Sequence, residues 1–115
     1  MDIIAFMRVH FYGKASGRSP VEEFISKLPK ADQARLLEAI LSIEEFGLSC
    51  PRVQFKPIRG KLWEIKIKAP GGGYRFFYVL VESDLMVILL AFKKKTQKAP
   101  QREIELAEKR MKEVI

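Results

Sequence analysis

Cationic side chains interrupt three apolar stretches in the second half of the chain. Lys66 and Lys68 alternate with isoleucines, Arg75 lies inside a run of aromatic and β-branched residues, and the apolar residues 85–92 end in three lysines, 93–95. Alternation exposes one side of a strand, and a cationic strand end places positive charge where a polyanion can reach it. The pattern therefore predicts a surface that binds phosphate groups, and it points toward RNA.

Lysine and arginine can also take part in RNA cleavage without a metal. That reaction needs activation of a 2′-hydroxyl, stabilisation of the negative charge on phosphorus and a proton for the leaving oxygen. Arginine stays protonated, so Arg75 is assigned to the phosphate and a lysine to proton transfer. The pKa of that lysine must fall from about 10.4 toward neutrality, and crowding among Lys93, Lys94 and Lys95 acts in this direction.

Each of these positions also has a plainer explanation. Lys66 and Lys68 could simply keep a strand face in water, and the lysines of residues 93–98 could form a solvated sheet edge. An unpaired charge inside an apolar strand is costly, so Arg75 needs either a buried partner such as Glu64 or an anionic ligand. If the cations do bind RNA, the candidate RNA-binding residues are Arg59, Lys61, Lys68, Lys93, Lys95 and Lys98.

The net charge of +7 is concentrated in one part of the chain. Residues 50–102 carry twelve lysines and arginines but three acidic residues, whereas the other residues carry nine basic and eleven acidic ones. This asymmetry is typical of a face that binds nucleic acid or an acidic protein. The longest apolar run, residues 85–92, is far shorter than the roughly 20 residues of a transmembrane helix.

The chain has one cysteine, Cys50, and one histidine, His10. A single cysteine excludes an intrachain disulfide and fits a reducing compartment, so a cytoplasmic location is expected. Two soft ligands are too few for a zinc site, and no metal or cofactor is expected.

The helices that must position the cationic residues have recognisable starts and ends. Ser19 followed by Pro20 predicts a helix over residues 20–28, and helical spacing predicts a second one over residues 30–46 that ends at Gly47. Pro100 opens a third predicted helix that runs to about Val114, with Ile104, Ala107 and Met111 as its apolar stripe.

The predicted strands carry most of the candidate residues. Residues 3–12 predict a first strand, and residues 62–68, 74–81 and 86–92 predict three more, joined by short turns into an antiparallel meander. Strand periodicity also places Trp63 and most of the aromatic residues 74–78 in the core.

The predicted order is therefore one strand, two helices, three strands and one helix, in a single α+β domain over residues 1–115. Helices are expected on one face of an antiparallel sheet, with the opposite face basic and partly open.

Four segments resemble the phage-derived, HigB-like branch of the RelE/ParE toxin superfamily. They are RGKLWEI at residues 59–65, YRFFY at 74–78, FKKKTQK at 92–98 and PQREIELA at 100–107, and the likeness covers nearly the whole chain. It implies a RelE-like fold and a type II toxin that cleaves mRNA, usually on the translating ribosome. It also implies neutralisation by a partner antitoxin with a helix-turn-helix domain.

The resemblance further implies roles for individual residues. Where enzymes of this superfamily have a lysine on the second strand and an arginine on the third, this chain has Lys66 and Arg75. Where they have a basic or polar group after the last strand, it has residues 93–95, with Lys94 at the centre. Lys66, Arg75 and Lys94 are thus the candidate catalytic residues. Relatives often add a tyrosine or histidine near the last helix, and this chain has none beyond Tyr78, so the proton donor is left unassigned.

Two other functions fit the same fold class. One is a ParE-like toxin that inhibits gyrase through protein contacts, and the other is an RNA-binding module or inactive toxin without cleavage chemistry. For an antitoxin, we expect an acidic or amphipathic segment that covers the basic face or packs along the helices.

Overall fold

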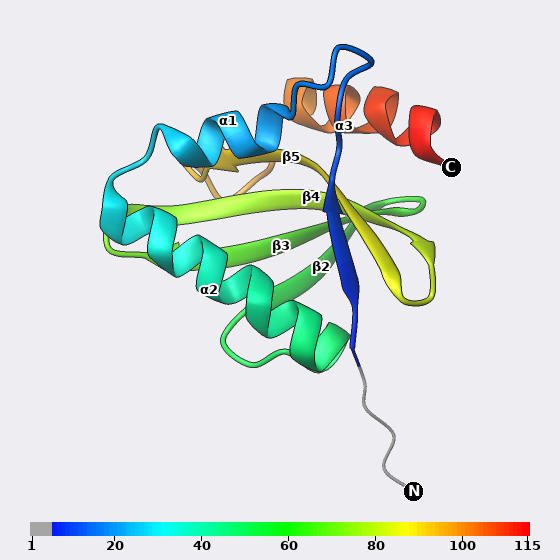
Figure 1. Cartoon of the computed structure of the whole chain (residues 1–115). Coiled ribbons are helices and arrows are strands. Elements are labelled where there is room, and N and C mark those ends of the chain that lie inside the picture. The colour runs from blue at the N-terminus through cyan, green and yellow to red at the C-terminus, as the bar shows by residue number, and fades with distance from the viewer. Residues whose placement is uncertain (1–5) are drawn as a thin grey trace, which may run out of the picture.

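A computed structural model describes residues 6–115 and contains five strands and three α-helices (Figure 1). In chain order they are β1 (Arg8–Phe11), α1 (Pro20–Ser26), α2 (Lys30–Phe46), the short 3-10 helix η1 (Gly47–Ser49), β2 (Gln54–Arg59), β3 (Leu62–Ala69), β4 (Gly72–Glu82), β5 (Leu85–Lys93) and α3 (Gln101–Val114). The α+β class and the three predicted helices are confirmed. Residues 3–5 of the expected first strand lie outside the described residues.

The strands form one mixed sheet in the order β1-β5-β4-β3-β2. Neighbours from β2 to β5 are antiparallel, which confirms the predicted meander. β1 is parallel to β5, with Arg8 opposite Leu85, so the sheet is not antiparallel throughout. The connection from β1 through α1 and α2 leads to β2 at the opposite edge of the sheet, and the meander then brings β5 back beside β1.

β2 was not predicted from the sequence. It is an edge strand that includes Pro57, and its register shifts between Pro57 and Arg59. Proline cannot donate a backbone hydrogen bond to a neighbouring strand, and it is tolerated at sheet edges or at bulges. A proline therefore argues against a strand when only the sequence is considered.

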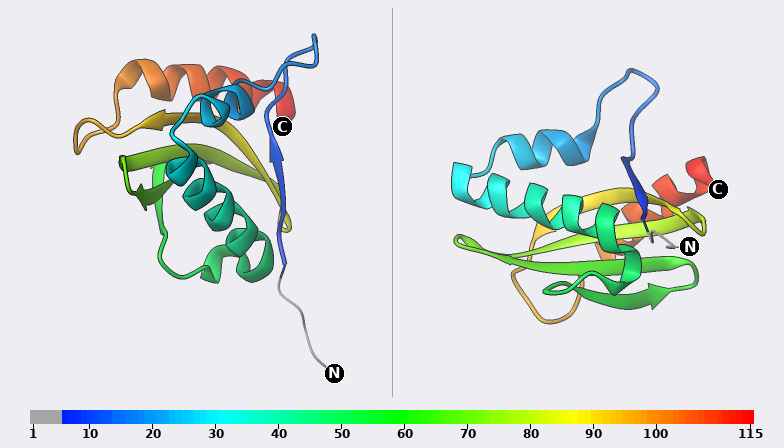
Figure 2. Two further views of the ribbon diagram at one scale, coloured as in Figure 1. Left: turned by 60° about the vertical axis from the view of Figure 1, so that its left-hand side comes forward. Right: turned by 60° about the horizontal axis from the view of Figure 1, so that its bottom comes forward.

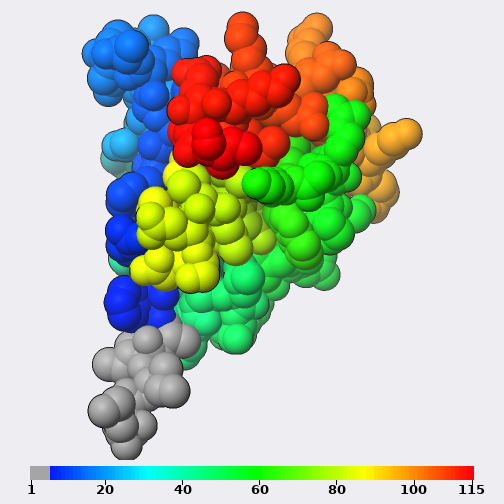
Figure 3. All heavy atoms as spheres, turned by 90° about the vertical axis from the view of Figure 1, so that its right-hand side faces the viewer, coloured from blue at the N-terminus to red at the C-terminus, as the bar shows by residue number. Residues whose placement is uncertain are grey.

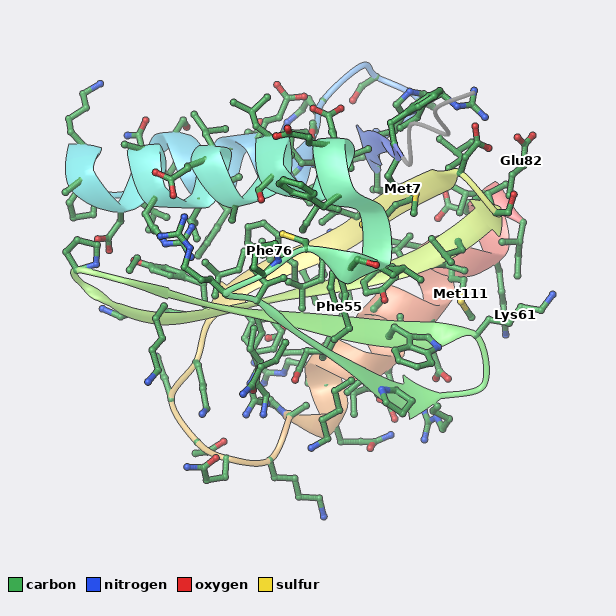
Figure 4. The ribbon with its side chains drawn as sticks, turned by 90° about the horizontal axis from the view of Figure 1, so that it is seen from below. Met7, Phe55, Lys61, Phe76, Glu82 and Met111 are labelled. Carbon is green, nitrogen blue, oxygen red and sulfur yellow. The ribbon has the colours of Figure 1, made fainter. Side chains whose placement is uncertain are left out.

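The helices cover both faces of the sheet, which corrects the expectation of helices on one face. α1 and α2 pack against the face that carries Ile65 and Phe76, whereas Ala107 of α3 packs against the face that carries Phe77 and Leu89. Figure 4 shows α2 on one side of the sheet and α3 on the other, and the two views of Figure 2 agree. Since α3 covers only part of its face, a basic surface remains beside it.

Local sequence signals explain the helix ends. Ser19 Oγ accepts a hydrogen bond from the Glu22 amide at 3.3 Å, and Pro20 occupies the first helical position of α1. Gly47 ends α2 with a φ of 62°, a left-handed conformation that glycine adopts without strain.

Most of the aromatic residues expected in the core are there, including Tyr74, Phe76, Phe77 and Tyr78. Trp63 is an exception, since 37% of its surface is exposed. At that end of the molecule, the β2–β3 hairpin and the β4–β5 turn lie below the C-terminal end of α3 (Figure 3). Within residues 6–115, no helix has both the length and the apolar character needed to cross a membrane.

Candidate nucleic-acid interface

An open pocket lies at the free edge of β3. β2 begins at Gln54, opposite Lys66, so among the described residues the last part of β3 has no strand beside it on that edge. The space there has a volume of about 820 Å³, and we call it the basic pocket. Four of its lining residues are cations, which suits an anionic ligand. The lining comprises Arg52, Val53, Gln54, Lys66, Ile67, Lys68, Ala69, Gly72, Gly73, Tyr74, Lys94 and Gln97.

Lys66 reaches this pocket because β3 alternates. Ile65 and Ile67 are buried against the α2 layer, so Lys66 projects toward the opposite face, where its side chain is 22% exposed. Its Nζ lies 3.9 Å from Oε1 of the buried Glu64. Lys66 is thus a half-buried cation beside an anion and at the wall of an open pocket.

The surroundings of Lys66 change its acidity. Partial burial lowers the pKa of Lys66 below its ordinary value, and the negative charge of Glu64 opposes this change. The positive charges of Lys56, Lys94 and Arg75 lower the pKa further. The sequence predicted such crowding within residues 93–95, but the structure places cations from three different segments around Lys66.

Arg75 is 1% exposed and faces Lys66 across the ladder between β3 and β4. Its Nε lies 3.5 Å from Glu64 Oε2, and its Nη2 donates to the backbone carbonyls of Thr96, at 2.7 Å, and Gln97. Glu64 is therefore the buried partner that the sequence allowed for Arg75. In this conformation the guanidinium is directed at the protein rather than at the pocket.

The segment after β5, residues 94–98, folds over Arg75, and we call it the 94–98 loop. The Lys94 amide donates to the Gly73 carbonyl at 2.8 Å, which ties the loop to the start of β4. Lys94 Nζ then donates to Gln97 Oε1 at 3.3 Å, and Thr96 Oγ1 donates to the Lys98 carbonyl at 2.7 Å. The loop thus brings Lys94 to the same pocket as Lys66.

The remaining candidate residues near this loop spread around its rim. Lys68 is exposed and lines the basic pocket. Lys98 borders a neighbouring hollow beside Lys56, and Lys93 and Lys95 border another beside Phe24. Cations therefore surround the loop, although they do not meet at one point.

Arg59 and Lys61 are not part of this group. They belong to the β2–β3 hairpin, at the far end of β3, and Figure 4 shows Lys61 at its tip, away from the 94–98 loop. Arg59 pairs with Glu108 of α3 through contacts of 2.9 Å and 2.5 Å, which ties the hairpin to the helix. Arg59 and Glu108 are far apart in the sequence, so the sequence did not predict this ion pair.

Tyr74 also lines the basic pocket, but its hydroxyl donates to the carboxylate of Asp32. Burial raises the pKa of Tyr74 to about 12, and the hydrogen bond to Asp32 adds to this rise. The same carboxylate accepts the Gly71 amide at 2.8 Å, and a Cβ on Gly71 would overlap it. We call this contact the Asp32 latch, which joins α2 to the β3–β4 turn and occupies the tyrosine proton.

Three pocket or rim residues were missed by the sequence analysis. Gln54 and Lys56 share the face of Lys66 and Glu64, because β2 pairs with β3 in that register. Arg52 precedes β2. All three depend on the unpredicted strand, whose sequence signal is short because the alternation of polar and apolar residues over 54–56 ends at Pro57.

Among residues 6–115, no three histidine, cysteine, aspartate or glutamate side chains gather closely enough to hold a metal ion. His10 is exposed on β1, away from the basic pocket. The side chains available for proton transfer at the pocket are therefore its lysines, together with the hydrogen-bonded Tyr74.

Two comparisons with known proteins give matches. The family model described as phage-derived protein Gp49-like matches residues 23–112, which include α2, the meander and most of α3. A crystal structure of an archaeal RelE–RelB complex from Pyrococcus horikoshii OT3 contains a similar chain, with 24% identity and a TM-score of 0.51. That match covers 82% of this chain and all of the other one. A comparison with curated proteins finds no match.

Proposed function

The chain belongs to the Gp49-like family of phage-derived proteins and has the RelE fold, and from this premise we propose that it is the toxin of a type II toxin–antitoxin pair. We further propose that it acts as a metal-independent endoribonuclease on mRNA, in the cytoplasm and on the translating ribosome. The observation that carries the proposal is the meeting of Lys66 and Lys94 in one open pocket, where burial and neighbouring cations lower the pKa of Lys66.

The proposed chemistry assigns one proton to each lysine. Neutral Lys66 accepts the proton of the 2′-hydroxyl, whose oxygen attacks the adjacent phosphorus. The bond from phosphorus to the 5′-oxygen breaks, and the ammonium of Lys94 gives a proton to that oxygen. The products are a 2′,3′-cyclic phosphate and a free 5′-hydroxyl. The ribosome would orient the mRNA, so the protein needs to supply only modest catalysis itself.

Arg75 has a more indirect part in this proposal. Its charge lies behind the pocket and stabilises negative charge that develops on the phosphate, and its hydrogen bonds hold the 94–98 loop. Direct contact with phosphate requires that loop to move. Lys68, Lys93, Lys95 and Lys98 provide phosphate contacts around the pocket, while Arg59 and Lys61 extend the charge to the far end of β3.

The proposal is tested by primer extension on cellular mRNA after the protein is induced. New 5′ ends are expected with the wild type, and few with Lys66→Ala or Arg75→Ala. Lys14→Ala, an exposed lysine in the loop before α1, serves as the control and should cut like the wild type. Absence of new ends with the wild type would refute the endonuclease, and undiminished cutting by both site variants would refute the roles assigned to Lys66 and Arg75.

The proposed partner is an antitoxin, and the structure favours a segment that packs along the helices. Leu37 and Leu41, one turn apart on α2, are 46% and 65% exposed, and Leu48 of η1 is 50% exposed. Leu48 also borders a hollow of about 620 Å³ that includes Trp63 and Phe55. This apolar surface suits an amphipathic helix.

The binding mode of the antitoxin can be read from salt dependence. If it packs on the apolar surface, its affinity should change little between low and high salt, and Leu41→Lys should weaken it strongly. Steep loss of affinity with salt, with no effect of Leu41→Lys, would instead indicate that it covers the basic face.

The burial of Arg75 favours a second function, an RNA-binding module without cleavage chemistry. With its guanidinium used inside the protein, the cations that line the pocket are Arg52 and three lysines. That function predicts salt-dependent RNA binding without new mRNA ends, even when ribosomes are present.

A further inference from the structure

Glu64 takes no part in the proposed cleavage chemistry, yet it lies between two of its cations. It is 1% exposed and stands two residues before Lys66, on the same side of β3. Its Oε1 is 3.9 Å from Lys66 Nζ, and its Oε2 is 3.5 Å from Arg75 Nε. A single buried carboxylate therefore contacts both the proposed base and the arginine behind it.

The contacts of Glu64 are poorly suited to stabilising the fold. Within the described residues, neither Glu64 Oε2 nor Arg75 Nε has a hydrogen-bond partner. Removing a carboxylate and a guanidinium from water is costly, and a long ion pair returns only part of that cost. A well-packed pair of apolar residues would serve stability at least as well, so the arrangement calls for another role.

Beyond Arg75, the contacts continue into the 94–98 loop. Arg75 Nη2 donates to the carbonyls of Thr96 and Gln97, and the side chain of Gln97 accepts a hydrogen bond from Lys94 Nζ. The orientation of the Arg75 guanidinium thus determines where the loop, and with it Lys94, can lie. Glu64 is the anion that faces this guanidinium from the side of β3.

We propose that Glu64 is a positioning residue, whose carboxylate holds Lys66 Nζ at the wall of the basic pocket and, through Arg75, keeps the 94–98 loop folded so that Lys94 faces Lys66. The catalytic meaning of this role rests on the proposed function, but the contacts themselves do not. The charged groups around Lys66 are Lys56 from β2, Glu64 from its own strand, Arg75 from β4 and Lys94 from the loop, with Arg52 and Lys68 farther along the pocket.

The first test compares the titration of Lys66 in the wild type and in Glu64→Gln. The titration is monitored by carbon-13 NMR of the lysine Cε, and the Lys66 signal is assigned by its absence in Lys66→Arg. The carboxylate stabilises the ammonium form, so its removal should move the titration midpoint of Lys66 to lower pH. Glu82→Gln removes the same charge from an exposed position at the end of β4 and should leave the midpoint in place. An unchanged or higher midpoint in Glu64→Gln would overturn the proposal.

The second test is hydrogen exchange of the Lys94 amide, which donates to the Gly73 carbonyl and ties the 94–98 loop to β4. Loss of the anion that orients Arg75 should make this amide exchange about tenfold faster or more, while the β4–β5 ladder keeps its protection. Equal exchange in Glu64→Gln and Glu82→Gln would contradict the role in holding the loop. If Glu64→Gln does not fold, the double variant Glu64→Gln/Arg75→Met removes both buried charges, and the same faster exchange is expected from it.

Activity provides a third measurement that separates this inference from the proposed function. If the wild type cleaves mRNA, Glu64→Gln should lower kcat about tenfold or more with little change in KM, because binding lysines remain in place. A fall in kcat accompanied by an equally large rise in KM would point to a general structural defect and would overturn the positioning role. If the wild type does not cleave, the proposed function fails, while the titration and the exchange still decide the role of Glu64.

Discussion

Lys66 is partly buried and has three neighbouring cations, and both features favour loss of its proton. Burial lowers the pKa of Lys66, so the neutral amine is present at lower pH than for a lysine in water. Cleavage that uses this amine as a base should rise with pH through the Lys66 pKa, and that rise should lie below about 10.4, the ordinary lysine value. A pH–rate profile on ribosome-bound mRNA measures it.

Lys66→Arg provides a sharper test at the same position. Arginine keeps the positive charge but does not lose its proton, so we expect cleavage to fall by about 10²-fold or more while RNA affinity stays within a few-fold. The matched control is Lys68→Arg, two residues along the same strand and exposed, which should retain most of the activity. Full activity in Lys66→Arg would show that this side chain does not transfer a proton.

The residues of the basic pocket were only partly predictable from the sequence. Alternation in β3 identifies Lys66 and Lys68 as members of one face, and the structure brings both to the basic pocket. The partners of Arg75 include the backbone carbonyls of residues 96 and 97, and a carbonyl carries no sequence signal. Backbone carbonyls of this kind decide whether an arginine inside an apolar strand binds a ligand or pairs within the protein. The sequence therefore left both possibilities open.

Between elements, the Asp32 latch joins α2 to the β3–β4 turn and should affect stability in a pH-dependent way. The hydrogen bond from Tyr74 lowers the pKa of Asp32, while burial opposes the change and the Gly71 amide and Lys93 add to it. A carboxylate with a lowered pKa stabilises the fold at neutral pH, and this stabilisation is lost as the pH falls below about 3.9 and through its pKa in the folded protein. Asp32→Asn should therefore lower the melting temperature at pH 7 and matter less near pH 3.

Thermal unfolding of wild type and Asp32→Asn across this pH range measures the effect. Glu38→Gln, an exposed position on the same helix with a side chain that is 60% exposed, is the control and should give a small difference at every pH. If the melting temperature of Asp32→Asn stays below that of the wild type by the same amount down to pH 3, the carboxylate charge does not stabilise the Asp32 latch.

The elements themselves were predictable where local chemistry dominates. Ser19, Pro20 and Gly47 mark helix ends through their own backbone preferences, and the strands of the meander have strong periodicity. β2 was missed because Pro57 breaks that periodicity, and the position of α3 could not be foreseen because it depends on the side to which the 94–98 loop turns. Local patterns specify elements, whereas the face that an element covers is a property of the connection.

For the whole molecule, the charge distribution predicts how RNA binding responds to salt. Each phosphate neutralised on single-stranded RNA contributes roughly −0.7 to the slope of log K against log salt concentration. Lys66, Lys68 and Lys94 line one pocket, so removing any one of them should reduce the slope by about that amount. Lys61→Gln, at the far end of β3, should change the slope less for a short oligonucleotide. Equal changes at all four positions would indicate a diffuse surface rather than a pocket.

The parallel pairing of β1 with β5 has a consequence for the order in which the protein can assemble. Arg8 lies opposite Leu85, so β1 can pair only after β5, which lies much later in the chain, has been synthesised. The 94–98 loop that closes over Arg75 is made later still. The pairing of β1 with β5 and the closure of the loop over Arg75 are thus contacts between separate parts of the chain. Such contacts form slowly, because the intervening chain must close into a loop first. The basic pocket is therefore complete only after the 94–98 loop has been synthesised.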